Sequence, residues 1–242
     1  MTITAVEPQK KNPKRFNIFL DGKFAFGADE DLVVSQRLTT GKIIKQEDLD
    51  KLVFEASVGK LMERMYGLFS LRQRSEKEVK DYLKTLSFKR KLKDQEEISE
   101  MVTSLLIERL KLKGLINDLE FAKAWVQSRR RSKQKGINAL KAELYQKGIS
   151  KEIIEEVVSS QPASPNRGEP SAVSEEELAR KALEKKMKSW RNLEHQKLKQ
   201  KAVEFLMRKG FDYGLAKSVV EKLLEKRYTT NSEIEEQYED DF

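Results

Sequence analysis

LKLKGLINDLEFAKAWVQSRRR, the stretch Leu110–Arg131, ends one helix and begins another. Gly114 can adopt the positive φ of a helix C-terminus, and it follows a turn that is rich in lysine. Asn117 is typical of an N-cap, and the Glu120 carboxylate can reach back to it. The apolar residues that follow repeat at the spacing of one helical face: Phe121, Ala122, Trp125 and Val126. The stretch therefore predicts two helices joined by a tight turn.

A second pattern in the chain is an internal repeat. The segment that begins at Leu144 aligns without gaps on the segment that begins at Leu206, 62 residues later. Lysine, glycine and a pair of valines coincide in the two copies, as Lys147-Gly148 and Lys209-Gly210 illustrate. Leu83 marks a weaker copy 61 residues before Leu144. A regular period of this length indicates a threefold repeat of one helical unit.

Each copy is expected to contain three helices that share a core with the neighbouring copy. Serine or aspartate stands at several predicted helix starts with glutamate three residues later, as in Ser75 with Glu78, Asp94 with Glu97, and Ser174 with Glu177. The apolar stripe of one predicted helix is Ile98, Met101, Val102, Leu105 and Leu106. We expect helices over residues 46–69, 75–87, 94–113, 117–132, 137–147, 150–160, 174–192, 194–209 and 212–227.

The N-terminus has a different pattern. Asp21-Gly22 suits a two-residue hairpin turn between residues 15–20 and 23–27, and alternate residues of the first strand are apolar. Ile3 and Val6 suggest a third short strand, and residues 28–38 a short helix. The fold class is therefore mainly α, an elongated array of three tandem three-helix repeats with a small N-terminal β-hairpin cap. Covering the open end of the array is the expected role of the cap, with a ligand site as the alternative.

These patterns divide the chain into consecutive segments. The expected ranges are 1–45 for the cap, 46–113 for the first repeat, 114–160 for the second, 161–173 for a linker, 174–227 for the third repeat and 228–242 for an acidic tail. The linker contains three prolines and little apolar content. The sequence leaves open whether the third repeat swings on this linker or packs through its own apolar stripe.

Charge is the main functional signal in the chain. The net charge is +8, but the acidic tail contains six acids and no Lys or Arg, so the preceding residues carry +14. A cationic body of this kind favours a polyanion such as nucleic acid as the partner. The alternative is a solvated surface of lysine and glutamate pairs, which we favour for residues 175–201. The cluster 129–135 has fewer acids nearby and is the better candidate for phosphate contacts.

Catalysis finds little support in the sequence. The chain contains no cysteine and one histidine, His195, which excludes thiol nucleophiles and histidine pairs as metal ligands or base relays. No phosphate-binding loop of the G-x-x-x-x-G-K-[ST] type is present, so we expect no ATP hydrolysis, no metal and no cofactor. His195 is interpreted as a surface residue at a helix start, and Trp125 as a core residue.

Several motifs together resemble a known family, the RecX regulatory proteins. They are RQRSEKEV at 72–79, GLINDLEFAKAWV at 114–126, KGI at 147–149 with its later copy KGF, and RFNIFLDGKFAFGADEDL at 15–32. The resemblance covers about residues 3–227. It implies a cytoplasmic protein of DNA repair, recombination and the SOS response that binds RecA recombinase filaments on DNA and modulates them, usually by inhibition.

The resemblance and the charge pattern together set the expected partners and contacts. We expect the RecA filament as partner, weaker salt-dependent binding to single- and double-stranded DNA, a monomer and no membrane association. The candidate contact residues are basic: Arg72, Arg74, Arg129, Arg130, Arg131, Lys133 and Lys135. A direct DNA-binding or nucleoid protein built of helix-turn-helix-like repeats is the alternative function, and a generic protein-interaction scaffold is a further one. The N-terminal MTITAVEPQKKNPK has no apolar segment, so we expect no secretory signal.

Overall fold

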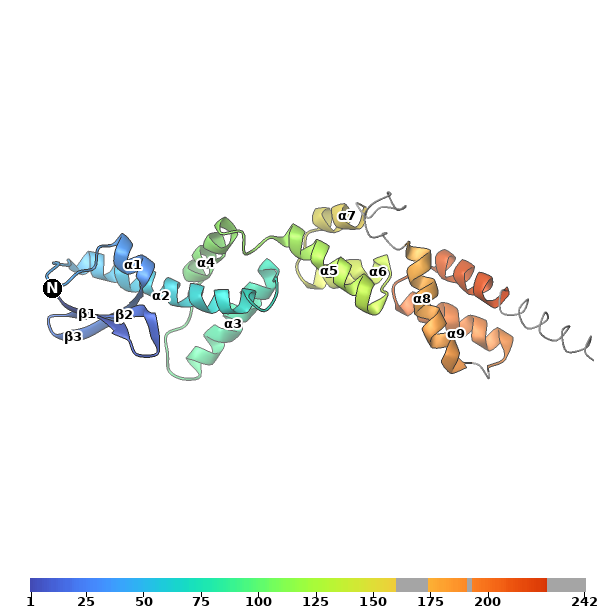
Figure 1. Ribbon diagram of the computed structural model, residues 1–242, viewed down its shortest axis with the longest axis horizontal. Helices are drawn as coiled ribbons and strands as arrows, with labels where there is room; N and C mark the ends of the chain where they lie inside the picture. Colours follow the sequence, from blue (N-terminus) through green and yellow to red (C-terminus); the bar gives the residue numbers. More distant parts are fainter. Residues whose placement is uncertain (160–173, 191–192, 226–242) are drawn as a thin grey trace, which may run out of the picture. The chain divides into compact units, whose positions relative to one another are not determined.

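The structure is a computed structural model that describes residues 1–159, 174–190 and 193–225 (Figure 1). It comprises two compact units, Met1–Ile116 and Asn117–Phe242. The described residues are mainly helical, with a small N-terminal antiparallel sheet. This architecture confirms the predicted fold class. The predicted linker and the acidic tail lie outside the described residues.

The sheet contains β1 (Ile3–Gln9), β2 (Asn12–Leu20) and β3 (Lys23–Asp29) in that order. Asp21 and Gly22 have φ values of 47° and 78°, and two positive values are what a hairpin turn matched to the strand twist requires. The predicted hairpin and the suggested third strand are both confirmed.

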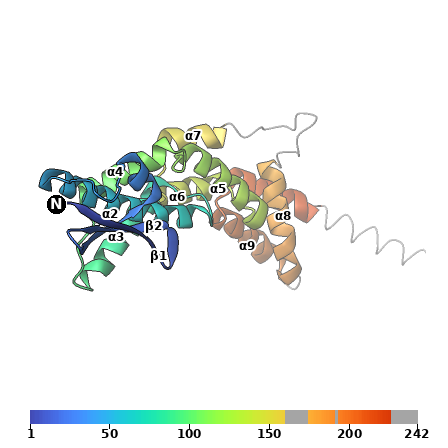
Figure 2. The ribbon, with the colours of Figure 1, turned by 60° about the vertical axis from the view of Figure 1, so that its left-hand side comes forward.

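The sheet packs against two helices, α1 (Glu30–Ser35) and the first part of α2 (Gln46–Phe69), as two views show (Figures 1 and 2). Asp29 caps α1 by accepting a hydrogen bond from the Leu32 amide at 2.8 Å. The helix is shorter than the predicted 28–38, because Arg37 adopts a φ of 47° that ends it. Residues from both layers form one core: Ile3, Ile18, Leu20, Phe26, Ala28, Leu32, Leu38, Ile44, Leu52 and Ala56.

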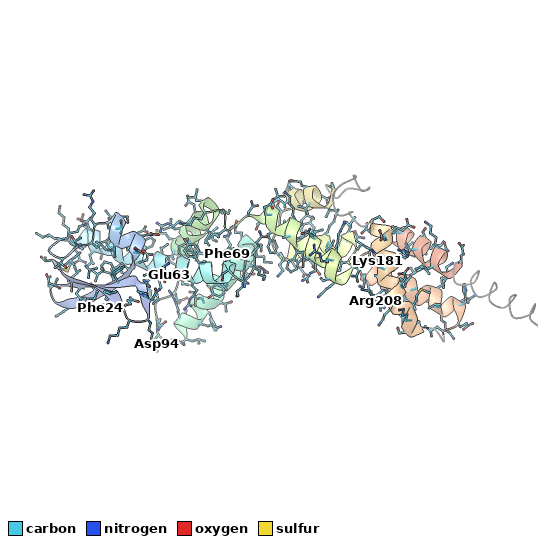
Figure 3. All side chains as sticks on the ribbon, viewed as in Figure 1. Phe24, Glu63, Phe69, Asp94, Lys181 and Arg208 are labelled. Carbon is cyan, nitrogen blue, oxygen red and sulfur yellow. The ribbon has the colours of Figure 1, made fainter. Side chains whose placement is uncertain are left out.

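The rest of the first unit consists of α2, α3 (Glu76–Lys91) and α4 (Glu100–Leu112). Ser75 caps α3 as predicted, accepting a hydrogen bond from the Glu78 amide. The predicted cap at Asp94 is wrong. Asp94 lies in the turn before α4 with a φ of 52°, and Ser99 provides the cap instead (Figure 3). Met101, which the sequence places on the apolar stripe, is 72% exposed because it lies away from the side of α4 that buries Val102, Leu106 and Leu110.

The second unit contains two groups of helices. The first group is α5 (Asp118–Lys133), α6 (Ile137–Gln146) and α7 (Lys151–Ser159). The second is α8 (Glu175–Met187), the 3₁₀ turn η1 (Lys188–Trp190), α9 (His195–Arg208) and a helical segment at 213–225. The helix predicted for 174–192 is thus α-helical only to Met187. Asn117 and Ser174 cap their helices as predicted.

Equivalent residues of the second and third repeats have the same structural roles. Gly148 and Gly210 have φ values of 78° and 91°, and each donates its amide to a carbonyl of the preceding helix at 2.9 Å. Both glycines therefore end a helix in the left-handed conformation. The aligned apolar pairs are buried in both copies: Leu144 and Leu206, Ile149 and Phe211, Ile154 and Ala216, Val157 and Val219. The alignment made from the sequence is confirmed.

The third repeat packs against the second through main-chain hydrogen bonds. The Gly136 amide donates to the Lys209 carbonyl, and the Asn138 amide to the Gly210 carbonyl, both at 3.0 Å. A Cβ at Gly136 would lie 2.5 Å from the Gly210 backbone, so the approach requires glycine. The third repeat thus contacts the second, but through these main-chain groups, whereas its apolar stripe lies in the core of the third repeat itself.

Candidate nucleic-acid interface

The predicted cationic cluster lies at the end of α5 and in the turn after it. Gln134 ends this helix in the left-handed conformation with a φ of 43°, which redirects the chain before Lys135. Cations are stabilised at this position because the helix C-terminus carries partial negative charge. The local sequence therefore explains why a basic group can accumulate here, and the question is which of its members remain available to a ligand.

Two members of the cluster form ion pairs with Glu143 of α6. The Arg129 Nε lies 2.9 Å from the Glu143 carboxylate, and Lys135 pairs with the second oxygen of the same group. The indole N–H of Trp125 also donates to Glu143, at 2.8 Å. Burial raises the pKa of Glu143, but the three hydrogen bonds outweigh it and the net effect is a lowered pKa. Arg129 and Lys135 are thus partly neutralised within the protein.

Trp125 lies at the edge of the core of the second repeat. Its ring stacks on Phe121 with 5.6 Å between centroids, and the Arg129 guanidinium carbon lies 4.2 Å from the ring centroid. Lys147 lies over the same ring at 4.9 Å. The predicted core role is confirmed only in part, because the ring is half-buried and two cations contact it.

The remaining members of the cluster differ in exposure. Arg130 is half-buried, and burial lowers its pKa while the charge of Glu175 acts in the opposite direction. Arg131 and Lys133 are exposed at the last turn of α5. These two residues are the members best placed to reach a phosphate in solution.

The two candidate residues of the first unit are engaged or half-buried. Arg72 forms a bidentate ion pair with Glu78, with N···O distances of 2.7 and 3.1 Å. Arg74 is half-buried just before α3. Arg72 is thus paired with a carboxylate in the first turn of α3. This ion pair supports a role in positioning the turn before α3 rather than a contact with a ligand.

Two further cations, Lys185 and Lys209, are not among the candidate contact residues but lie where the third repeat meets the second. The Lys209 ammonium donates to the Lys133 carbonyl at 2.6 Å. Burial lowers the pKa of Lys209, and the charges of Lys185 and Lys135 lower it further. The alignment of Lys147 on Lys209 singled out this position, but only the fold shows that Lys185 lies near it.

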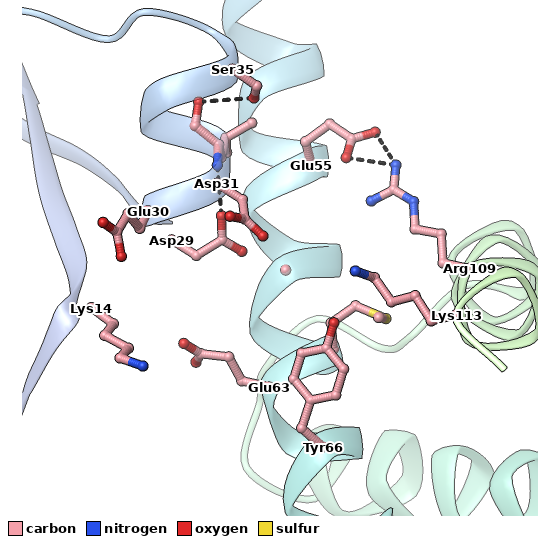
Figure 4. Close-up of a pocket in the computed structure, with 13 residues that line it drawn as sticks. Lys14, Asp29, Glu30, Asp31, Ser35, Glu55, Glu63, Tyr66, Arg109 and Lys113 are labelled. Atoms are coloured by element: carbon pink, nitrogen blue, oxygen red, sulfur yellow. Dashed lines mark hydrogen bonds and ion pairs between the residues drawn. The ribbon is translucent and has the colours of Figure 1, made fainter. Parts of the chain in front are cut away.

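One pocket of the first unit has the opposite charge. Its cavity of about 540 Å³ is lined by Asp29, Asp31, Glu55 and Glu63, together with Lys14, Arg109 and other residues (Figure 4). Glu55 pairs with Arg109 at 2.8 Å, which ties α4 to α2, and Glu63 pairs with Arg15 of the sheet at 3.1 Å. An acidic pocket repels phosphate, so this pocket is not part of a nucleic-acid interface.

The described residues contain neither a metal-binding cluster nor a membrane-spanning helix. No group of three or more His, Cys, Asp or Glu residues in these ranges is arranged to hold a metal ion. None of the helices that the structure describes is long and apolar enough to span a bilayer. His195 is the first residue of α9 and is exposed, as predicted.

Comparison with known proteins identifies the family. Residues 1–45 match the regulatory protein RecX N-terminal domain, 117–158 the second RecX three-helix domain and 174–220 the third. The chain belongs to the RecX family of regulatory proteins. The regulatory protein RecX of Bacillus subtilis (strain 168) is 35% identical over 224 residues, which cover 91% of this chain and 76% of the relative. RecX of Bacillus pumilus is 33% identical over 97% of this chain and 81% of its own length.

Solved structures agree with this assignment. A crystal structure of regulatory protein RecX superimposes with a TM-score of 0.67 at 26% identity, covering 90% of this chain and 98% of that one. The RecX structure from Lactobacillus salivarius has a TM-score of 0.55 at 23% identity and supports the fold alone. The resemblance inferred from the sequence motifs is therefore confirmed, and the cationic residues described above belong to a RecX fold.

Proposed function

We propose that this RecX family protein binds RecA nucleoprotein filaments and modulates them, most often by inhibiting ATP hydrolysis, filament growth and strand exchange in DNA repair and recombination. Family membership supports the regulatory role. The observation that supports the polyanion contact is the exposure of Arg131 and Lys133 at the end of α5, where Lys209 of the third repeat contacts the Lys133 carbonyl. As the family resemblance implies, we place this activity in the cytoplasm and assign it to a monomer.

The proposed mechanism is binding without catalysis. The repeats would lie in the helical groove of the filament, span neighbouring RecA protomers and obstruct further growth or strand exchange. Exposed arginine and lysine would approach DNA phosphates, where Arg131 can form bidentate contacts and Lys133 acts as a point charge. The sequence lacks a nucleotide-binding loop, so the ATPase activity to be measured is that of RecA.

The test is a titration of this protein into RecA bound to single-stranded DNA, with ATP hydrolysis and strand exchange as readouts. The proposal predicts a changed rate at substoichiometric amounts and no ATP hydrolysis by the protein itself. An unchanged RecA rate over the full titration would remove the proposal.

Direct DNA binding as a nucleoid protein is the second candidate function. The basic end of α5 supports it, because three-helix units with cationic edges also suit duplex DNA. This candidate predicts tight, strongly salt-dependent binding to naked DNA and no dependence on RecA. The RecA titration and a naked-DNA titration at the same salt therefore separate the two functions.

A further inference from the structure

The contact between the second and third repeats has an unusual helix start. Gly136 precedes α6 and provides no side chain to cap it. Instead, Glu175 of α8 accepts a hydrogen bond from the Ile137 amide at 2.6 Å. Together with the main-chain bonds of Gly136 and Asn138, this contact makes the third repeat part of the N-terminal cap of α6. The two repeats therefore meet in one defined geometry.

Several cations from different segments gather at this contact. Lys133 ends α5, Lys185 lies in the last turn of α8, and Lys209 caps the end of α9. Lys135 lies in the turn before α6, where its ion pair with Glu143 partly neutralises it. We call these four residues the junction lysines. Two of them belong to the second repeat and two to the third. The four lysines can therefore lie close together only when the two repeats are docked.

The simplest account of the junction lysines is that they neutralise helix C-termini. Lys209 does donate to the Lys133 carbonyl at the end of α5, which fits that account. It covers Lys185 as well, which is exposed in the last turn of α8, but it does not explain why cations from both repeats act on Lys209. The charges of Lys185 and Lys135 instead oppose the protonation of Lys209. The contact thus contains repulsion among cations that an added anion would relieve.

We propose that the junction lysines form a phosphate-binding clasp, which takes the phosphodiester backbone of a nucleic acid between the second and third repeats. Phosphate accepts hydrogen bonds from several ammonium groups at once and offsets their mutual repulsion. Binding and docking are then coupled, since an anion that contacts both repeats favours their docked arrangement. This inference rests on the proposed nucleic-acid contact and assigns it a site.

Charge reversal at Lys185 tests the clasp, because it should raise the stability of the free protein and lower its affinity for nucleic acid. Lys185→Glu places a carboxylate near Lys209, so the free protein should melt at a higher temperature than wild type. The same change should weaken binding to single-stranded oligodeoxythymidine by about tenfold at low salt and flatten the salt dependence. Lys185→Ala should weaken binding less. A residue with a purely structural role would not raise stability while lowering affinity.

Lys186→Glu is the matched control. It makes the same change in net charge on the same helix, but Lys186 is not among the cations that act on Lys209. The same concentration of oligodeoxythymidine should raise the melting temperature of wild type and Lys186→Glu equally and that of Lys185→Glu by less. Equal affinities and equal shifts for the two glutamate variants would overturn the clasp.

The RecA titration separates failure of the clasp from failure of the proposed function. If wild type changes the RecA rate but the two glutamate variants bind oligonucleotide equally, the clasp is wrong and the function stands. If only Lys185→Glu loses oligonucleotide binding while wild type leaves RecA unaffected, the clasp stands and the RecA role is wrong.

Discussion

The second and third repeats have the same arrangement of helices and buried residues. One of the positions at which they differ determines whether an acid neutralises the nearby cations. Glu143 of the second repeat aligns on Phe205 of the third in the gapless alignment of the two copies. Glu143 binds Arg129 and Lys135, whereas Phe205 packs edge-on against Trp190 with 5.7 Å between ring centroids. An acid thus neutralises cations in one repeat, while an aromatic ring occupies the same place in the other.

The aligned lysines show the consequence. Lys147 lies over the Trp125 ring, and Lys209 lies 5.5 Å from the Phe205 ring centroid but also reaches the Lys133 carbonyl across the junction. The shared core residues therefore determine the fold of each repeat. The partly buried positions between them determine how many of its cations are neutralised. The following experiments test this difference between the repeats.

The largest expected effect concerns the two tryptophans. Trp190 has 8% of its surface exposed, whereas Trp125 is half-buried. Trp190→Ala should lower the free energy of unfolding by about 3 to 5 kcal/mol, and Trp125→Ala by about 2 kcal/mol, because less of its ring leaves the core. Chemical denaturation of both variants measures the difference. Equal losses would show that the two rings contribute equally to their repeats.

A second experiment tests the close approach of the repeats. A Cβ at Gly210 would lie 2.3 Å from the Ala139 nitrogen, and its φ of 91° also disfavours alanine. Gly210→Ala should therefore destabilise the second unit by about 2 to 4 kcal/mol. Gly114→Ala is the control, since its φ of 68° is also positive but nothing lies within 4 Å of the added Cβ. Thermal melts that show the same loss for both variants would contradict the tight junction.

Removing the acid of the second repeat should increase its available positive charge. Glu143→Gln releases Arg129 and Lys135 and raises the net charge by one. We expect a few-fold tighter binding to naked DNA at low salt, with a salt slope steeper by about 0.7 to 0.9 for each added phosphate contact. Fluorescence anisotropy over a salt series measures both quantities. Unchanged affinity and slope would mean that Arg129 and Lys135 do not contact DNA even when they are no longer paired with Glu143.

The same glutamate predicts a pH dependence. Because the pKa of Glu143 is lowered in the folded protein, its contribution to stability is present above its ordinary value of 4.5 and is lost as the pH falls through the lower folded value. Wild type should therefore lose more stability on acidification below about pH 4.5 than Glu143→Gln does. Parallel melting curves for the two proteins over this range would show that the carboxylate is not stabilised by its partners.

The smallest expected effect concerns the acidic tail, 228–242, whose composition of six acids and no cations suits transient contact with a basic surface. Its removal should tighten binding to naked DNA at low salt, with the difference shrinking as salt screens both interactions. If full-length and tail-less proteins bind equally at low salt, the tail affects solubility alone.

The sequence predicts those features that depend on neighbouring residues. Asn117, Ser75 and Ser174 cap their helices because the cap and its partner amide lie within one turn, and Gly114 needs only its own backbone freedom. The predicted start of α4 is wrong, because Asp94 has a glutamate three residues later whereas Ser99 has Val102 at that position, and only the fold shows that Ser99 is the cap.

The charge distribution could be predicted only in part. The cluster at the end of α5 was visible in the sequence, but the ion pairs that occupy Arg129 and Lys135 depend on Glu143 in another helix. The contact between Lys209 and Lys133 joins residues 76 positions apart. Such pairs arise from tertiary packing, so the number of cations in a segment does not give the number available to a ligand.

The most direct test of the central claim is the RecA ATPase titration performed with wild type and with an Arg131→Ala, Lys133→Ala double variant. These two residues are exposed, so their removal should leave folding intact. We predict that wild type changes the DNA-dependent ATPase rate of RecA at substoichiometric amounts and that the double variant requires higher concentrations for the same effect. A RecA rate that wild type leaves unchanged at every concentration would contradict the account.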